Sequence, residues 1–166
     1  MWAVYDRLRS ASLSVKYYGC RLQHVERVNF WLDLMLFAAA PSSTIAGLGF
    51  WKFGMGPFAW QALGAIAAII AIVKPLLGLA KRIKEYEGML VGYRTLEYDL
   101  MELRTSVSQK RKYDTTLQAQ FQKVQQRERV LIGKTPDPRE NARLKARCQA
   151  EVLKELPADS FFVPEE

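Results

Sequence analysis

The chain has 166 residues and a formal net charge of +7, and its mean hydropathy of −0.11 is that of an ordinary soluble protein. The average hides a partition, because residues 34–51 and 53–73 contain no charged side chain while the remainder is densely charged. A soluble domain of this size would spread its apolar residues along amphipathic elements, so the segregation predicts an all-α membrane protein. The basic residues flank the apolar segments without an aromatic–basic motif, which disfavours nucleic acid as a partner.

Residues 1–29 form the first predicted segment, an amphipathic helix that covers residues 2–28. Its apolar and aromatic residues recur at three- and four-residue steps, as on one face of a helix. Such a helix either lies on the membrane surface or packs against the rest of its own cytoplasmic region. We favour packing, because the chain offers it a long helical partner. The residues of this face are Trp2, Tyr5, Leu8, Val15, Tyr18, Leu22 and Val25.

Residues 30–80 predict a two-helix transmembrane hairpin. The first span covers about residues 30–49, because roughly 20 residues at about 1.5 Å rise cross a hydrocarbon core of about 30 Å. Pro41 is a candidate hinge within it. A short turn rich in glycine follows at residues 52–57, and the second span covers about residues 58–79.

The second span contains small residues at close spacing. Gly64 and Ala68 are four residues apart, as are Ala67 and Ala71, and this spacing lets helix backbones approach closely. These four residues are therefore candidate helix-packing positions. Equally, glycine and alanine are simply common in membrane helices, and the sequence leaves both interpretations open.

Two charged residues fall inside the predicted spans, where charge is costly. Asp33 lies near the start of the first span and Lys74 near the end of the second, so a hairpin places both at one membrane depth. They either pair, within one hairpin or between subunits, or face water and line the inner mouth of a pore. The alternative is that Asp33 reaches the interface and Lys74 snorkels to it. Pro75 follows directly and is a second candidate hinge.

The distribution of basic residues predicts the orientation. The turn between the spans carries only Lys52, while both flanking segments are rich in lysine and arginine, so both termini are expected in the cytoplasm. Cys20 and Cys148 then lie in a reducing compartment and are expected as separate thiols. Together with the single His24 they provide too few ligands for a metal site.

Residues 81–132 predict a long cytoplasmic helical or coiled-coil region. Apolar residues follow steps of three, four or seven. The pattern slips between Tyr93 and Leu96, and Lys110 and Asp114 interrupt it later. Either one long helix or two helices folding back would fit. The runs comprise Ile83, Tyr86, Leu90 and Tyr93, then Leu96, Leu100, Leu103 and Val107, then Leu117, Phe121, Val124 and Leu131.

Residues 133–166 predict a break, a short helix and an acidic tail. Glycine and two prolines mark the break at residues 133–138, and the helix covers about residues 139–156. The apolar group at residues 161–163 is expected either to be disordered with the tail or to dock on the helical region. No catalytic constellation and no phosphate-binding glycine loop is visible, so neither an enzyme nor a cofactor is expected.

Three short stretches and the order of the parts resemble a known family. The stretches are residues 5–11 (YDRLRSA), 93–97 (YRTLE) and 147–152 (RCQAEV). With an amphipathic helix, a tight hairpin and a long helical region, the chain resembles the SLATT family, two-transmembrane effectors of bacterial nucleotide-signalling defence systems.

The resemblance implies a homo-oligomer in the lipid of the bacterial inner membrane. Such a protein would permeabilise that membrane when a defence sensor or a nucleotide synthase releases it. Its spans would form the pore, and its cytoplasmic helices would control assembly. The alternative function is a membrane-anchored coiled-coil scaffold that recruits a cytoplasmic partner.

Overall fold

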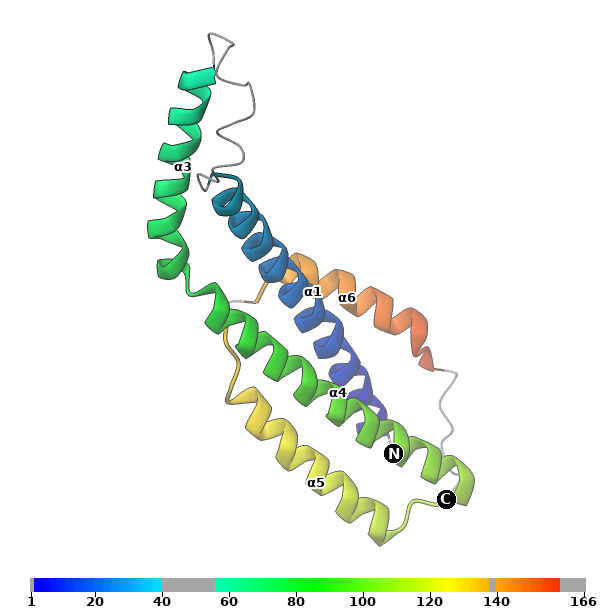
Figure 1. The fold of residues 1–166 in the computed structure, drawn as a ribbon. Helices are drawn as coiled ribbons and strands as arrows, with labels where there is room; N and C mark the ends of the chain where they lie inside the picture. Colours follow the sequence, from blue (N-terminus) through cyan, green and yellow to red (C-terminus); the bar gives the residue numbers. More distant parts are fainter. Residues whose placement is uncertain (1, 40–55, 138–139, 159–166) are drawn as a thin grey trace. The chain divides into compact units, whose positions relative to one another are not determined.

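The computed structural model describes residues 2–39, 56–137 and 140–158, and within these ranges the chain is helical and contains no strand (Figure 1). This confirms the all-α class. The helices are α1 (Trp2–Ala39), α3 (Gly56–Leu77), α4 (Leu79–Lys110), α5 (Thr115–Ile132) and α6 (Ala142–Glu155). The chain divides into two compact units. Unit 1 comprises Met1–Leu22 and Lys84–Glu166, and unit 2 comprises Gln23–Ile83.

Helix α1 is continuous through the boundary predicted near residue 29. The predicted amphipathic helix and the beginning of the first predicted span are therefore one element. The physical reason lies in the sequence, because residues 2–39 contain no proline and a single glycine, so nothing ends the helix. Residues 40–49, with the candidate hinge Pro41, lie outside the described residues.

The core of unit 1 is built where α1, α4, α5 and α6 pack together. Leu8 of α1 and Leu100 of α4 are completely buried. Leu117 of α5 and Cys148 of α6 are also buried. The buried residues of α1 repeat at helical spacing, so one face of the helix faces the core. This confirms that the N-terminal helix packs against the rest of its own region. The buried residues of α1 in unit 1 are Val4, Tyr5, Leu8, Ala11, Ser12, Tyr17, Tyr18 and Leu22.

The buried face of α4 keeps an uninterrupted alternation of three- and four-residue steps. The predicted slip between Tyr93 and Leu96 is wrong, because Met89 is buried where the sequence pattern had used Leu90. Where two apolar residues are adjacent, the sequence pattern does not show which one lies on the buried face, and the packing of the helices decides it. The buried residues of α4 in unit 1 are Tyr86, Met89, Tyr93, Leu96, Leu100, Leu103 and Val107.

The region 81–132 forms two helices that fold back on each other, as the weakened pattern near Lys110 allowed. Asp114 caps α5, since its carboxylate accepts the backbone N–H of Leu117 at 2.9 Å. Further along, α4 and α5 approach so closely at Gly92 that a Cβ there would overlap the side chain of Leu131. Glycine therefore suits this close approach of the two helices, and a larger residue would require the Leu131 side chain to shift.

In unit 2, α3 ends at Leu77 instead of continuing to residue 79 as predicted. Gly78 has φ +57°, a left-handed conformation that suits glycine, and α4 begins at Leu79. The helix continues for two residues past Pro75, whose carbonyl accepts the Gly78 N–H at 3.2 Å. The break thus lies at Gly78, three residues after the candidate hinge.

The predicted break after α5 is confirmed, and α6 follows it. The last helix runs over Ala142–Glu155, within the predicted range of 139–156. Asn141 caps it by accepting the backbone N–H of Leu144 at 3.1 Å. Residues 161–163 lie outside the described residues.

Candidate functional site

Unit 2 exposes the large apolar side chains that its helices carry. Phe37 of α1 is 81% exposed and Leu76 of α3 is 80% exposed, whereas the described residues of unit 2 bury only Val25 and Leu79. Burying apolar surface is the main favourable term in folding, so an exposed surface of this extent marks an interaction site. The exposed residues are Phe30, Trp31, Leu34, Met35, Phe37, Ile66, Ile69, Ile72, Val73, Leu76 and Leu77.

The two charges predicted inside the spans meet in unit 2. The Lys74 ammonium donates a hydrogen bond to Asp33 Oδ1, and Asn29 Nδ2 donates to Asp33 Oδ2 at 3.0 Å. Of the arrangements that the sequence left open, the structure has the pair within one chain, between α1 and α3. Sequence reasoning missed Asn29, although its position one helical turn before Asp33 was a usable signal.

A cavity of about 380 Å³ lies beside this ion pair. The break at Gly78 shapes it, because the chain changes direction there between α3 and α4. The lining residues are Asn29, Lys74, Pro75, Gly78, Leu79 and Ala80. Lys74 therefore contacts both the carboxylate of Asp33 and this cavity. The sequence signal for Gly78 was weak, because Gly64 lies in the same apolar stretch without breaking the helix.

The four small residues of α3 do not share one environment. Ala67 is half-buried, like Ile70 and Lys74, which follow it at helical spacing. Gly64, by contrast, is exposed together with Ala68 and Ala71, and a Cβ at Gly64 would meet no atom within 4 Å. The exposed three leave a smooth strip on the helix surface that a second helix could approach closely.

Within the described part of the chain, no single helix is both long and apolar enough to cross a bilayer. Residues Gly64–Leu77 taken together with α4 satisfy the length and composition requirement as a pair, bent by 42° at the break.

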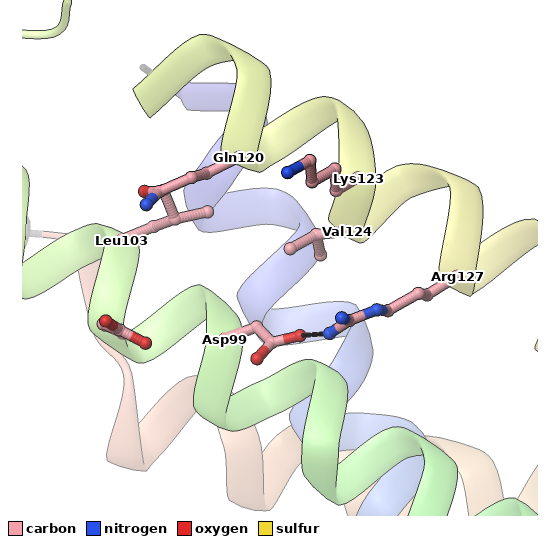
Figure 2. Close-up of a pocket in the computed structure, with 7 residues that line it drawn as sticks. Asp99, Leu103, Gln120, Lys123, Val124 and Arg127 are labelled. Carbon is pink, nitrogen blue, oxygen red and sulfur yellow. Dashed lines mark hydrogen bonds and ion pairs between the residues drawn. The ribbon is translucent and has the colours of Figure 1, made fainter. Parts of the chain in front are cut away.

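Unit 1 contains a groove of about 160 Å³ between α4 and α5 (Figure 2). The Arg127 guanidinium donates to the Asp99 carboxylate across one side of it, as the dashed line in Figure 2 shows. Glu102 and Lys123 add one charge of each sign to the lining. This groove could not be predicted from the sequence, because its residues come from two helices whose pairing is a tertiary feature.

Three tyrosines of unit 1 cluster between α1 and α4. Tyr18 stacks on Tyr93 with a ring-centroid distance of 5.6 Å, and Tyr86 lies 6.3 Å from Tyr18. Burial raises the pKa of all three phenols. Arg21 donates to the Tyr86 hydroxyl at 3.0 Å and pairs with Asp137, which joins the loop before α6 to this cluster.

The chain was compared with protein families, curated proteins and solved structures. No protein-family model, no curated protein and no solved structure matches the chain. Among the described residues, no three His, Cys, Asp or Glu side chains gather as a metal-binding group.

Proposed function

We propose that unit 2 is inserted in a lipid bilayer as a helical hairpin and that the protein oligomerises there to form a pore. The observation that supports the proposal is the exposed apolar surface of unit 2, on the same helices as the ion pair of Asp33 and Lys74. Contact between this apolar surface and hydrocarbon has no unfavourable free energy, whereas contact with water is unfavourable. Both termini would lie in the cytoplasm, at the inner membrane of a bacterium.

The helix lengths support this arrangement. The whole of α3 has 22 residues, or about 33 Å at 1.5 Å per residue, which matches a hydrocarbon core of about 30 Å. The stretch Gly64–Leu77 is by itself too short, so the proposed span needs the first turns of α3. Its partner within the proposed hairpin would be the end of α1, which reaches Ala39.

The ion pair supports a role beyond anchoring. In water such a pair contributes at most about 1 kcal/mol, but a charge inside a bilayer requires a partner or a water-filled cavity. Lys74 has such a partner in Asp33, and it also lines the cavity at Gly78, which water could fill. In an oligomer, this position would place a ring of charges at the cytoplasmic mouth, with the strip of Gly64, Ala68 and Ala71 between subunits.

The biological setting of the proposal comes from the SLATT resemblance. In that setting the protein is an effector of an anti-phage defence system. A sensor protein or a nucleotide signal would act on unit 1, and the pore would then permeabilise the membrane of the infected cell.

The proposal is tested with the full chain in liposomes. We expect oligomers in the bilayer and release of ions or dye once the protein is activated. Asp33→Asn and Lys74→Gln should change conductance or ion selectivity, because each removes one charge from the mouth. A matched control is the pair Asp99 and Arg127 of unit 1, where Asp99→Asn should leave conductance unchanged. A strictly monomeric protein that never causes leakage would contradict the proposal.

A second candidate function is a membrane-anchored scaffold, which the mixed-charge groove of unit 1 favours. Glu102 and Lys123 line this groove, where they could bind a charged helix of a cytoplasmic partner. Replacing residues 30–80 with an unrelated hairpin separates the two functions. A scaffold would keep its activity after the exchange, whereas a pore would lose it.

A further inference from the structure

The groove between α4 and α5 lies in a surface that both helices build, here called the outer face. Val91 and Tyr98 of α4 are exposed apolar residues, as is Val130 of α5. Tyr98 precedes Glu102 by four residues and Val130 follows Lys123 by seven, so each shares a helix face with a groove residue. Exposed apolar side chains around a polar groove indicate an interaction surface. The outer face comprises Val91, Tyr98, Glu102, Lys123 and Val130.

Two of the four charges that line the groove are neutralised within the chain. The Arg127 guanidinium of α5 donates to the Asp99 carboxylate of α4 (Figure 2). The other two charges are Glu102 of α4 and Lys123 of α5, and both residues are exposed. Neither forms an ion pair within the part of the chain that the structure describes. Glu102 and Lys123 are therefore the charges that a partner would meet.

A second copy of this chain matches the placement of these two charges. In a two-fold contact, a surface meets the same surface of the other copy. A two-fold axis parallel to the helices places α4 of one copy on α5 of the other, so that Glu102 faces Lys123. An axis across the helices would instead place α4 on α4 and set like charges against each other, which is unfavourable. Charge complementarity therefore selects the axis parallel to the helices.

The register of the two helices also fits this axis. Rotation about an axis parallel to the helices leaves each residue at its own height along them. Glu102 and Lys123 line one groove and thus lie at similar heights, so each would meet the other residue type in the second copy. Because Asp99 pairs with Arg127 and the chain runs in opposite directions in α4 and α5, Tyr98 and Val130 lie within about one helical turn in height. These two apolar residues would pack across the same contact.

We propose that two copies of the chain associate through the outer face, with α4 of each copy on α5 of the other. Two symmetric pairs of Glu102 and Lys123 would fix the register, since exposed ion pairs contribute more to specificity than to affinity. Tyr98 would supply much of the affinity, as buried tyrosines do in protein contacts. The inference rests on the oligomerisation in the proposed function, to which it adds a surface and a symmetry.

The test uses the full-length protein in mild detergent and follows self-association by analytical ultracentrifugation. Glu102→Lys and Lys123→Glu should each raise the dissociation constant by roughly tenfold or more, because two attractive pairs become two repulsive pairs. An equimolar mixture of the two variants should recover association, since every pair across the contact is then of opposite charge. A charge effect within one chain cannot produce this recovery.

A cross-link reports which helices face each other. In a Cys20→Ser background, which removes the exposed native thiol, one preparation carries Tyr98→Cys and a second carries Val130→Cys. A short bismaleimide added to the mixture should join the two preparations faster than it joins either one to itself. Faster joining within the Tyr98→Cys preparation would place α4 on α4 and overturn the proposed arrangement.

The matched control for the charge variants is Arg143→Glu on α6. This exposed residue lies off the outer face, and its substitution changes the net charge by the same amount as Lys123→Glu. It should change the dissociation constant by less than about twofold. An equal loss in this control, or a mixture of Glu102→Lys and Lys123→Glu that associates no better than either alone, would overturn the proposal. Binding of a different helical protein to a monomeric chain would assign the groove to the scaffold function instead.

Association and membrane leakage are measured separately, so the proposed contact and the proposed pore fail in different ways. A chain that associates as described but never permeabilises liposomes would contradict the pore and leave the contact standing. A chain that permeabilises liposomes without recovery in the mixture of Glu102→Lys and Lys123→Glu would overturn the contact and leave the pore standing.

Discussion

In unit 1, α1 buries Leu8 completely, whereas in unit 2 the same helix leaves Phe37 81% exposed. The contrast extends to the other helices, because α4 buries Leu100 in unit 1 while α3 leaves Ile72 67% exposed in unit 2. Unit 1 therefore has the apolar interior of a protein that folds in water. Unit 2 has its described large apolar residues mostly exposed, and the proposed function places this surface in lipid. Under that proposal, the two ends of the single helix α1 would lie in two different solvents.

The largest expected difference concerns the cores of the two units. Leu100→Ala should lower the free energy of unfolding of unit 1 by about 2–5 kcal/mol, because it removes a completely buried side chain and leaves a cavity. Ile72→Ala in unit 2 should change the free energy of unfolding by less than about 0.5 kcal/mol. Urea unfolding followed by the near-ultraviolet circular dichroism of the tyrosines measures both. Equal losses would mean that Ile72 is covered within the folded chain.

Ile69 of unit 2 and Val91 of unit 1 are apolar residues of similar exposure, at 61% and 63%. If unit 2 faces lipid, Ile69→Lys should weaken membrane insertion by about 2.5–3.5 kcal/mol, the cost of a lysine near the centre of a bilayer. Val91→Lys should have no such effect. Sedimentation of membranes after alkaline carbonate extraction reports the membrane-bound fraction. If the two variants partition alike, the exposed face of unit 2 does not bind lipid.

The smallest expected effect is a pH dependence confined to unit 1. Burial raises the pKa of Tyr18 and Tyr93 above the ordinary value of 10.0, so the folded state favours the protonated phenols. Their contribution to stability is complete below pH 10.0 and is lost as the pH rises through the raised pKa values. Unit 1 should therefore unfold on alkaline titration, as tyrosinate absorbance and circular dichroism report. Tyr93→Phe should shift the midpoint to higher pH, whereas Tyr98→Phe, at a 70% exposed position, should not.

Much of the helical organisation could be predicted from the sequence. Helical periodicity in residues 2–28 indicated a helix that packs against its own region, and glycine and proline at residues 133–138 indicated the break before α6. Asp33 and Lys74 could be matched because two charges in otherwise uncharged runs stand out. Gly64, Ala68 and Ala71 could be identified from the sequence as small residues at close spacing. Their exposure, in contrast to the half-buried Ala67, could not be predicted.

Composition and periodicity by themselves determined the all-α class, the apolar segments and the two charges within them, because these are properties of neighbours along the chain. Tertiary structure alone decided that Met89 rather than Leu90 is buried, that the helix breaks at Gly78 and that Asn29 joins the ion pair of Asp33. It also brought α6 against α1, where the Lys16 ammonium donates to Glu155 Oε1 at 2.8 Å across most of the length of the chain. Such contacts depend on how helices pack across long sequence separations, and a local pattern does not encode that packing.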